Sequence, residues 1–220
     1  MSTPFYQIAI DGPAGAGKST IAQLVAKQLN FLFINTGGMY RCYAIALKNT
    51  DLNNLPAVSQ VLKSNQVTLE GQRLFLNGVD VTNEAYTSEI SGLASTIGTI
   101  KIVRQKCVLD QQAIAQGHNV VMEGRDTTTV VLPNATLKVF LTASPEVRAH
   151  RRWLQSNKTQ SLAMIDEDIR KRDYQDTHRA IDPLTKTTDA IEINTDNKTI
   201  DQNVNEVITA FMIKKEGKCA

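Results

Sequence analysis

A glycine-rich stretch from Gly12 to Ser19 carries the residue types that bind the phosphates of a nucleotide. It has a first glycine, four free positions, Gly17-Lys18 and then the hydroxyl residue Ser19. Backbone N–H groups of a tight loop, together with the positive end of a following helix, can surround a triphosphate. In this pattern the lysine reaches the outer phosphates and the hydroxyl ligates Mg2+. The predicted triphosphate-binding residues are Gly12, Pro13, Ala14, Gly15, Ala16, Gly17, Lys18, Ser19 and Thr20, with Ser19 as the metal ligand.

Both flanks of this motif have the structure that it requires. Residues 6–10 form a short apolar run that predicts a buried strand, and Ser19 to Leu29 repeats apolar residues at helical spacing. A strand, a glycine-rich turn and a helix are the context in which the motif binds phosphate. The alternative is a glycine-rich turn that binds nothing, and the full spacing with both flanks disfavours it.

Length and composition narrow the class of protein. The chain has 220 residues, of which 42% are apolar, and a formal net charge of +2. This favours a single domain with inserted lobes and argues against general nucleic-acid binding. Three widely separated cysteines do not indicate a disulfide framework or a zinc site. With no visible signal peptide or membrane-spanning stretch, we expect a cytoplasmic protein, and a monomer as the default.

Three further predicted strands end in polar or charged turns. Residues 31–34 run into Asn35 and a turn that opens a helix near Arg41, residues 119–123 deliver Gly124-Arg125-Asp126, and residues 137–141 precede a helix start at Ser144-Pro145. Ligands of open parallel sheets bind at the carboxyl ends of strands. A cation in the first turn of a helix is not favoured by the helix dipole, so Arg41 either holds an anion or is an ordinary solvated arginine.

The middle of the chain has a different pattern. Residues 66–69, 73–76 and 79–81 read as short strands, separated by the turn pairs Glu70-Gly71 and Asn77-Gly78. They predict a small antiparallel lobe, at about 64–84, inserted in an α/β chain. Two helical segments follow between residues 87 and 117.

A dense group of basic residues lies between Arg148 and Arg179, on two predicted helices joined by a polar break at residues 156–161. Downstream of a phosphate-binding loop, such a pair predicts a lid, at about 148–180, that closes over bound phosphates and expels water. The alternative is a solvated helical hairpin without that function.

Taken together, these segments closely resemble bacterial-type cytidylate kinase over nearly the whole chain. The specific signals are residues 35–41 (Asn-Thr-Gly-Gly-Met-Tyr-Arg), Gly124-Arg125-Asp126 and the arginine-rich segment from Ala143 to Leu184. The resemblance implies a P-loop three-layer α/β fold with a parallel five-stranded core, a nucleoside-monophosphate region at about 36–118 and a helical lid. It also implies Mg2+-dependent transfer of the ATP γ-phosphoryl group to CMP or dCMP.

The resemblance also implies roles for individual residues. Thr36, Arg41 and Arg125 would hold the acceptor's phosphate, Ser95, Arg104 and Asp126 would read the cytosine edge, Arg172 and Asp176 would contact the sugar, and Arg179 would lie close to the nucleotide. Lys18, Arg148 and Arg152 would neutralise the transferring group, and Asp126 is a candidate proton acceptor.

Four positions depart from the family's pattern. Asn35 stands where the family usually has Asp, Thr127 replaces a bulky apolar residue, Thr128 replaces Gly, and Thr142 stands where Asp is common. A carboxylate at position 35 could bind Mg2+ through water, which an amide does less well. A threonine at position 128 either crowds the approach to the phosphate or changes the turn.

Two other functions compete with this interpretation. Another small P-loop kinase would phosphorylate UMP, AMP or a metabolite such as shikimate in preference to CMP. A guanine-nucleotide switch would need Asn-Lys-x-Asp, but Asn157-Lys158 and Asn197-Lys198 are not followed by that aspartate.

Overall fold

The computed structural model describes residues 5–155 and 160–217. Within them the chain forms two compact units. Unit 1 contains the described residues up to Phe33 and from Gly117 onward, and unit 2 spans Ile34–Gln116. Among the described residues, no helix is both long and apolar enough to cross a membrane.

A five-stranded parallel sheet is the framework of unit 1, as the resemblance implied. Its strand order is β2-β6-β1-β7-β8. The five strands are β1 (Gln7–Asp11), β2 (Leu32–Asn35, ending in the first residues of unit 2), β6 (Val120–Gly124), β7 (Leu137–Thr142) and β8 (Ile191–Asn194). In the central register Ile8 pairs with Val121 on one side and with Leu137 on the other. The carboxyl ends of β1, β6 and β7 therefore lie side by side.

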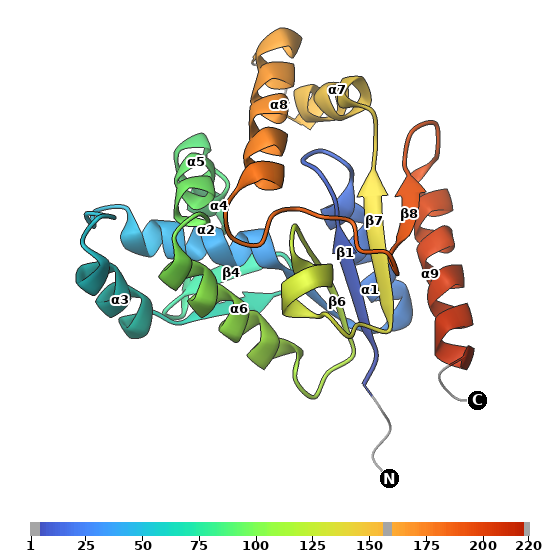
Figure 1. The fold of residues 1–220 in the computed structure, drawn as a ribbon, viewed down its shortest axis with the longest axis horizontal. Helices are drawn as coiled ribbons and strands as arrows, with labels where there is room; N and C mark the ends of the chain where they lie inside the picture. The colour runs from blue at the N-terminus through green and yellow to red at the C-terminus, as the bar shows by residue number, and fades with distance from the viewer. Residues whose placement is uncertain (1–4, 156–159, 218–220) are drawn as a thin grey trace. The chain divides into compact units, whose positions relative to one another are not determined.

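Two helices, α1 (Lys18–Leu29) and α9 (Ile200–Gly217), pack on one face of this sheet (Figure 1). The core joins alternate strand residues, such as Ile8 and Ile10, to Val25 of α1 and Phe211 of α9. These side chains are almost completely buried. The packing fixes the start of α1 against the sheet, and with it the loop that precedes the helix.

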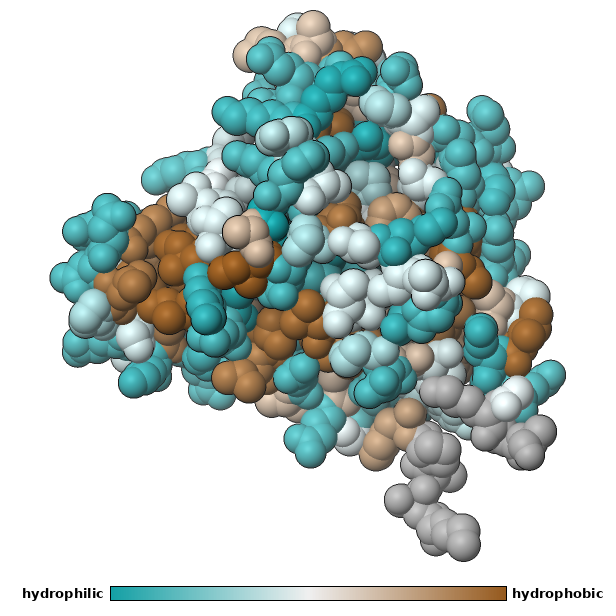
Figure 2. Space-filling view, viewed as in Figure 1, coloured by the Kyte–Doolittle hydropathy of each residue, from teal (hydrophilic) through white to brown (hydrophobic). Residues whose placement is uncertain are grey.

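The two predicted lid helices are present as α7 (Pro145–Gln155) and α8 (Leu162–His178), and they lie beside each other beyond the end of β7 (Figure 1). Ser144 caps α7 as predicted, because its Oγ accepts a hydrogen bond from the Val147 N–H. Ala149, Ile165 and Ile169 form a small core between the helices, against which Trp153 packs. Their outer surface is mostly hydrophilic (Figure 2). Residues 156–159 of the predicted polar break lie outside the described residues.

Unit 2 contains the predicted antiparallel lobe, with strands β3 (Val67–Glu70), β4 (Arg73–Leu76) and β5 (Val79–Asp80) in that order. Asn77 and Gly78 both have positive φ, 52° and 80°, which is the conformation that the Asn-Gly pair predicts for a two-residue hairpin. The helices of the unit are α2 (Thr36–Leu47), α3 (Leu55–Ser64), α4 (Thr82–Ala85), α5 (Ser88–Ile97) and α6 (Lys101–Ala115). Cys42 and Cys107 are buried cysteines of this unit that are not in a disulfide.

Candidate active site

The glycine-rich loop joins β1 to α1, which confirms the predicted strand, turn and helix. A side chain at position 12 is excluded, since a Cβ there would come within 2.0 Å of the Leu141 carbonyl oxygen. Gly15 and Gly17 have φ of 77° and 89°, which glycine adopts without strain. The loop is thus a tight backbone turn at the positive end of α1, where a negatively charged group is favoured.

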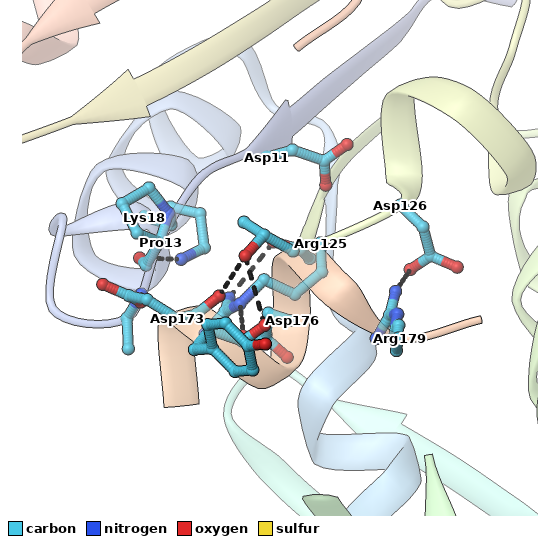
Figure 3. Close-up of polar contacts among 12 residues, drawn as sticks. Asp11, Pro13, Lys18, Arg125, Asp126, Asp173, Asp176 and Arg179 are labelled. Atoms are coloured by element: carbon cyan, nitrogen blue, oxygen red, sulfur yellow. Dashed lines mark hydrogen bonds and ion pairs between the residues drawn. The ribbon is translucent and has the colours of Figure 1, made fainter. Parts of the chain in front are cut away.

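Lys18 is the first residue of α1 and is only 5% exposed. Its Nζ donates a hydrogen bond of 2.8 Å to the Pro13 carbonyl oxygen (Figure 3). The pKa of Lys18 is lowered to about 7, first by burial and second by the positive charge of Arg125, while the nearby carboxylates of Glu123, Asp176 and Asp11 act in the opposite direction. Lys18 therefore gives up its proton at a much lower pH than an exposed lysine does.

Binding of a polyphosphate at this loop is expected to take up a proton at pH 8. Lys18 is then mostly neutral in the free protein, because its pKa is about 7, and an incoming negative charge favours its protonated form. A terminal phosphate is already ionised at this pH, since its second pKa is about 6. Uptake should approach one proton, and affinity should fall by up to about tenfold per pH unit above pH 7.

Calorimetric titration with ATP in two buffers of different ionisation enthalpy measures this proton uptake. Lys18→Met should remove it, whereas Lys27→Met, which removes an exposed lysine of the same helix, should retain it. Equal heats in the two buffers with the unmodified protein would contradict the prediction.

Ser19 faces a carboxylate that sequence reasoning missed. The Ser19 Oγ donates a hydrogen bond of 2.7 Å to Oε1 of Glu123, which is 5% exposed at the end of β6. The sequence does contain a feature that points to Glu123, because this residue directly precedes Gly124-Arg125-Asp126 at a strand's carboxyl end. A hydroxyl and a carboxylate are hard oxygen donors of the kind that Mg2+ prefers.

The segment after β6 brings two predicted acceptor-site residues into ion pairs with the C-terminal part of α8 and the residue that follows it. Arg125 Nε donates to Asp176 Oδ2 at 2.7 Å, and Arg179 Nη2 lies 3.8 Å from Asp126 Oδ1 (Figure 3). Burial alone would raise the pKa of Asp176, but Arg125, with Arg172 and Arg179, holds that pKa below its ordinary value. The carboxylate is therefore ionised.

A short π-helix, η1 (Thr127–Val131), follows Asp126 and was not predicted. Its start is held by Asp11, which accepts hydrogen bonds from the N–H of Thr127 at 3.0 Å and from the N–H and Oγ1 of Thr128, both at 2.7 Å. Thr128 is 1% exposed. Of the two alternatives for this departure, the hydroxyl is used to fix the turn, because it is bonded to a buried carboxylate.

Arg148 is held more tightly than its predicted role suggested. Its Nε donates to the Ala143 carbonyl and its Nη1 to the Ala14 carbonyl, both at 3.0 Å, and it pairs with Asp173 of α8. Gly15 packs against it, since a Cβ there would lie 3.0 Å from the Arg148 Cβ. Arg148 therefore braces the glycine-rich loop from α7.

The other predicted residues of unit 1 occupy more exposed positions. Ser19 and Thr20 are exposed at the start of α1, Arg152 is half-buried on α7, and Arg172 is half-buried on α8. Arg152 forms no hydrogen bond or ion pair with the described part of the chain. Thr142 is one of the four residues that depart from the family's pattern. Its carbonyl accepts a hydrogen bond from the Thr195 N–H at 2.9 Å, which links β7 to the end of β8.

In unit 2, Asn35 is a helix cap. Its Oδ1 accepts the Gly38 N–H at 2.9 Å, and its Nδ2 donates to the Tyr86 hydroxyl at 3.3 Å. Helix α2 therefore starts at Thr36, and the expectation that Arg41 lies in its first turn is wrong, because residues 36–40 are already helical. Arg41 is half-buried instead, with its guanidinium 5.1 Å from the ring centroid of Tyr86.

The two predicted base-reading residues of unit 2 are on neighbouring helices. Arg104 of α6 is 2% exposed and donates from Nη1 to the Gly98 carbonyl at 3.1 Å, with Tyr40 nearby at 5.9 Å from its guanidinium. Gly98 is the C-cap of α5, the helix that carries the half-buried Ser95. Arg104 thus fixes the end of the helix that presents Ser95. Thr36 is 4% exposed at the start of α2.

Known proteins of one family are similar to this chain along nearly its whole length. Residues 8–213 match the family model described as cytidylate kinase. The chain is 44% identical over 209 residues to a cytidylate kinase of Alkaliphilus oremlandii, covering 93% of this chain and 96% of the relative. It is 44% identical over 219 residues to one from Desulfitobacterium hafniense, covering 96% and 94%. Among solved structures, shikimate kinase from Acinetobacter baumannii, in complex with shikimate, shares the fold, with a TM-score of 0.50, 15% identity and coverage of 96% and 95%.

Proposed function

The chain belongs to the cytidylate kinase family, and we propose on this premise that it transfers the γ-phosphoryl group of ATP to CMP or dCMP. In this reaction the bond from the γ-phosphorus to the β,γ-bridging oxygen breaks and a bond to an oxygen of the CMP phosphate forms. The products are ADP and CDP or dCDP. The observation that carries the proposal is the family match over residues 8–213, combined with the phosphate-binding loop and its buried lysine.

ATP is the phosphoryl donor in this proposal, bound by Gly12 to Thr20. The loop's N–H groups and the start of α1 would surround its phosphates, and the buried Lys18 would neutralise their charge. Donation from Lys18 to the Pro13 carbonyl supports this role, because the same contact holds the ammonium group against the loop. Arg148 keeps the loop in shape, and the guanidinium of Arg152, which has no hydrogen-bond or ion-pair partner among residues 5–155 and 160–217, would approach the transferring group.

Mg2+ is the metal that this chemistry needs, and the residues at the start of α1 fit it. Mg2+ in such sites is usually held by one or two protein oxygens, with the substrate's phosphates and water completing its shell. The Ser19 hydroxyl and the Glu123 carboxylate, 2.7 Å apart, would hold it. The ion would supply positive charge that offsets the charge developing on the phosphate oxygens. Asn35 is not needed for this role, since its side chain caps α2.

CMP or dCMP is the proposed acceptor. Thr36, Arg41 and Arg125 would hold its phosphate, and Arg172 and Asp176 its sugar. Ser95, Arg104 and Asp126 would read the base, with Arg179 close by. An arginine and a carboxylate complement the acceptor atoms and the exocyclic amine of cytosine. A base with the opposite donors and acceptors would leave buried groups unpaired, which is a strong basis for discrimination.

Phosphoryl transfer asks little covalent work of the protein. Alignment of the two substrates and neutralisation of charge supply most of the rate. We therefore assign no nucleophile to the chain, and we propose Asp126 as the group that could accept a proton from a protonated acceptor phosphate. We also propose that the protein acts as a monomer in the cytoplasm, without nucleic acid or membrane.

A coupled assay of ADP release tests the reaction. With Mg2+-ATP and each of CMP, dCMP, UMP, AMP, GMP and shikimate, we expect CMP and dCMP to be turned over at least about a hundredfold more efficiently than the others. Preference for a different acceptor would keep the donor site and discard the proposed base-reading residues. Nucleotide binding without turnover of any acceptor would favour a nucleotide-dependent switch instead.

A further inference from the structure

An aspartate of α8 is bonded to the phosphate-binding loop. The Ala14 N–H donates a hydrogen bond of 3.2 Å to Oδ1 of Asp173, and the other carboxylate oxygen of Asp173 pairs with Nη1 of Arg148. The residues are 159 positions apart in the chain. The Asp173 side chain is about one-fifth exposed and that of Arg148 less than one-tenth. The contact is thus specific and partly shielded from water.

The groups that Asp173 contacts are of the kind that bind phosphate. A loop N–H beside a helix start and an arginine guanidinium both favour an anion with several acceptor oxygens. A carboxylate is such an anion. In addition, Asp176, one turn further along α8, is paired with Arg125. Two carboxylates on the same face of α8 therefore neutralise two arginines, Arg125 directly after β6 and Arg148 of α7.

We propose that Asp173 sets the affinity of the donor site, because its carboxylate occupies an anion position on the phosphate-binding loop that a nucleotide's phosphates must take over. This rests on the proposed function, in which the loop binds ATP. Each binding event would exchange the contacts of Asp173 with Ala14 and Arg148 for contacts with phosphate. The cost of that exchange would lower the affinity of the free protein for ATP.

The proposal predicts an effect opposite to that of a structural residue. Removing the charge of Asp173 would leave Arg148 and the loop N–H available, so polyphosphates should bind more tightly. If Asp173 only held the loop in a competent shape, its removal would weaken binding. Because the competition is for phosphate, inorganic tripolyphosphate should respond as ATP does, although it has neither base nor sugar.

The experiment measures dissociation constants of ATP and of inorganic tripolyphosphate by titration calorimetry, for the unmodified protein, Asp173→Asn and Asp168→Asn. Asp168 is an exposed aspartate on the same helix, so its replacement makes the same change in net charge away from the loop. We expect Asp173→Asn to bind both probes about tenfold more tightly and Asp168→Asn to change binding less than twofold. Circular dichroism establishes that each variant is folded.

The emission of Trp153, the single tryptophan of the chain, gives a second readout because it packs against the core between α7 and α8. The half-saturating ATP concentration for any emission change should fall by the same factor in Asp173→Asn. Asp173→Ala, which also removes the acceptor oxygens, should bind both probes at least as tightly as Asp173→Asn.

Less than a threefold gain over Asp168→Asn for either probe, or a loss of affinity, would overturn the proposal while ATP binding by the unmodified protein still supports the donor site. Failure of every variant to bind ATP and tripolyphosphate would instead overturn the proposed function, and this inference with it.

Discussion

Replacing Lys18 by methionine should lower turnover by about a hundred- to a thousandfold while the protein remains folded. Lys18 is buried at the start of α1, and its Nζ is held by the Pro13 carbonyl. In a site with little water, a fixed cation stabilises charge on a transferring phosphoryl group strongly, and loss of one preorganised donor costs about a hundred- to a thousandfold in rate. Methionine keeps the length and the packing but not the charge. The steady-state rate of ADP release measures the effect.

Lys18→Met should not lower the stability of the folded protein. Burial lowers the pKa of Lys18 from its ordinary value of 10.5 to about 7. Between these two pH values the lysine is protonated in the unfolded chain and releases its proton on folding. Below pH 7 the lysine is charged in both states and the native state bears the whole cost of burying that charge. The cost is relieved as pH rises from 7 to 10.5. Methionine removes it, so the midpoint of thermal unfolding at pH 7 should not fall.

Lys27→Met is the matched control for Lys18→Met, because Lys27 is exposed in the last turn of the same helix. It should retain full activity. Comparable activity in both variants would contradict the assignment of Lys18 to the donor's phosphates. Loss of the circular dichroism spectrum of the folded protein in Lys18→Met would show that the lysine is structural.

Local patterns were sufficient to predict most of the elements. The pair Asn77-Gly78 predicted a hairpin turn, because both residues tolerate positive φ. Ser144 followed by Pro145 predicted the start of α7, because capping needs only residues near in sequence. Strands β1, β2, β6 and β7 were visible as short apolar runs between polar turns. In each case the residues that form the sequence pattern lie within a few positions of the element that they predict.

Features that depend on distant contacts were missed or misjudged. The π-helix after Asp126 is held by Asp11, more than a hundred positions earlier in the chain. The contact of Asp173 with Ala14 likewise spans 159 positions. By contrast, the error over Arg41 was local: the capping residue Asn35 could have been recognised, since asparagine is a preferred N-cap.

Asp126→Asn should reduce the preference for CMP over UMP, measured as the ratio of kcat/KM values, by at least about tenfold. Asp126 is 4% exposed and its backbone carbonyl accepts hydrogen bonds from the N–H groups of Val130 and Val131, so η1 fixes its position. A carboxylate accepts hydrogen bonds from the cytosine amine and donates none. Asparagine offers both a donor and an acceptor, so it can also satisfy the carbonyl oxygen of uracil.

The same variant separates the two roles proposed for Asp126. If it reads the base, kcat/KM for CMP should fall while that for UMP holds or rises. If it acts only as a proton acceptor, both values should fall together and their ratio should stay within about twofold, which would remove Asp126 from base recognition. Asp189→Asn is the control, because Asp189 is an exposed aspartate that pairs with Lys138 and has no proposed role in the site.

The contact of Asp126 with Arg179, at 3.8 Å, allows a further check with Arg179→Lys, which keeps the positive charge. If the ratio of kcat/KM values changes in Asp126→Asn but not in Arg179→Lys, the discrimination between CMP and UMP belongs to the carboxylate.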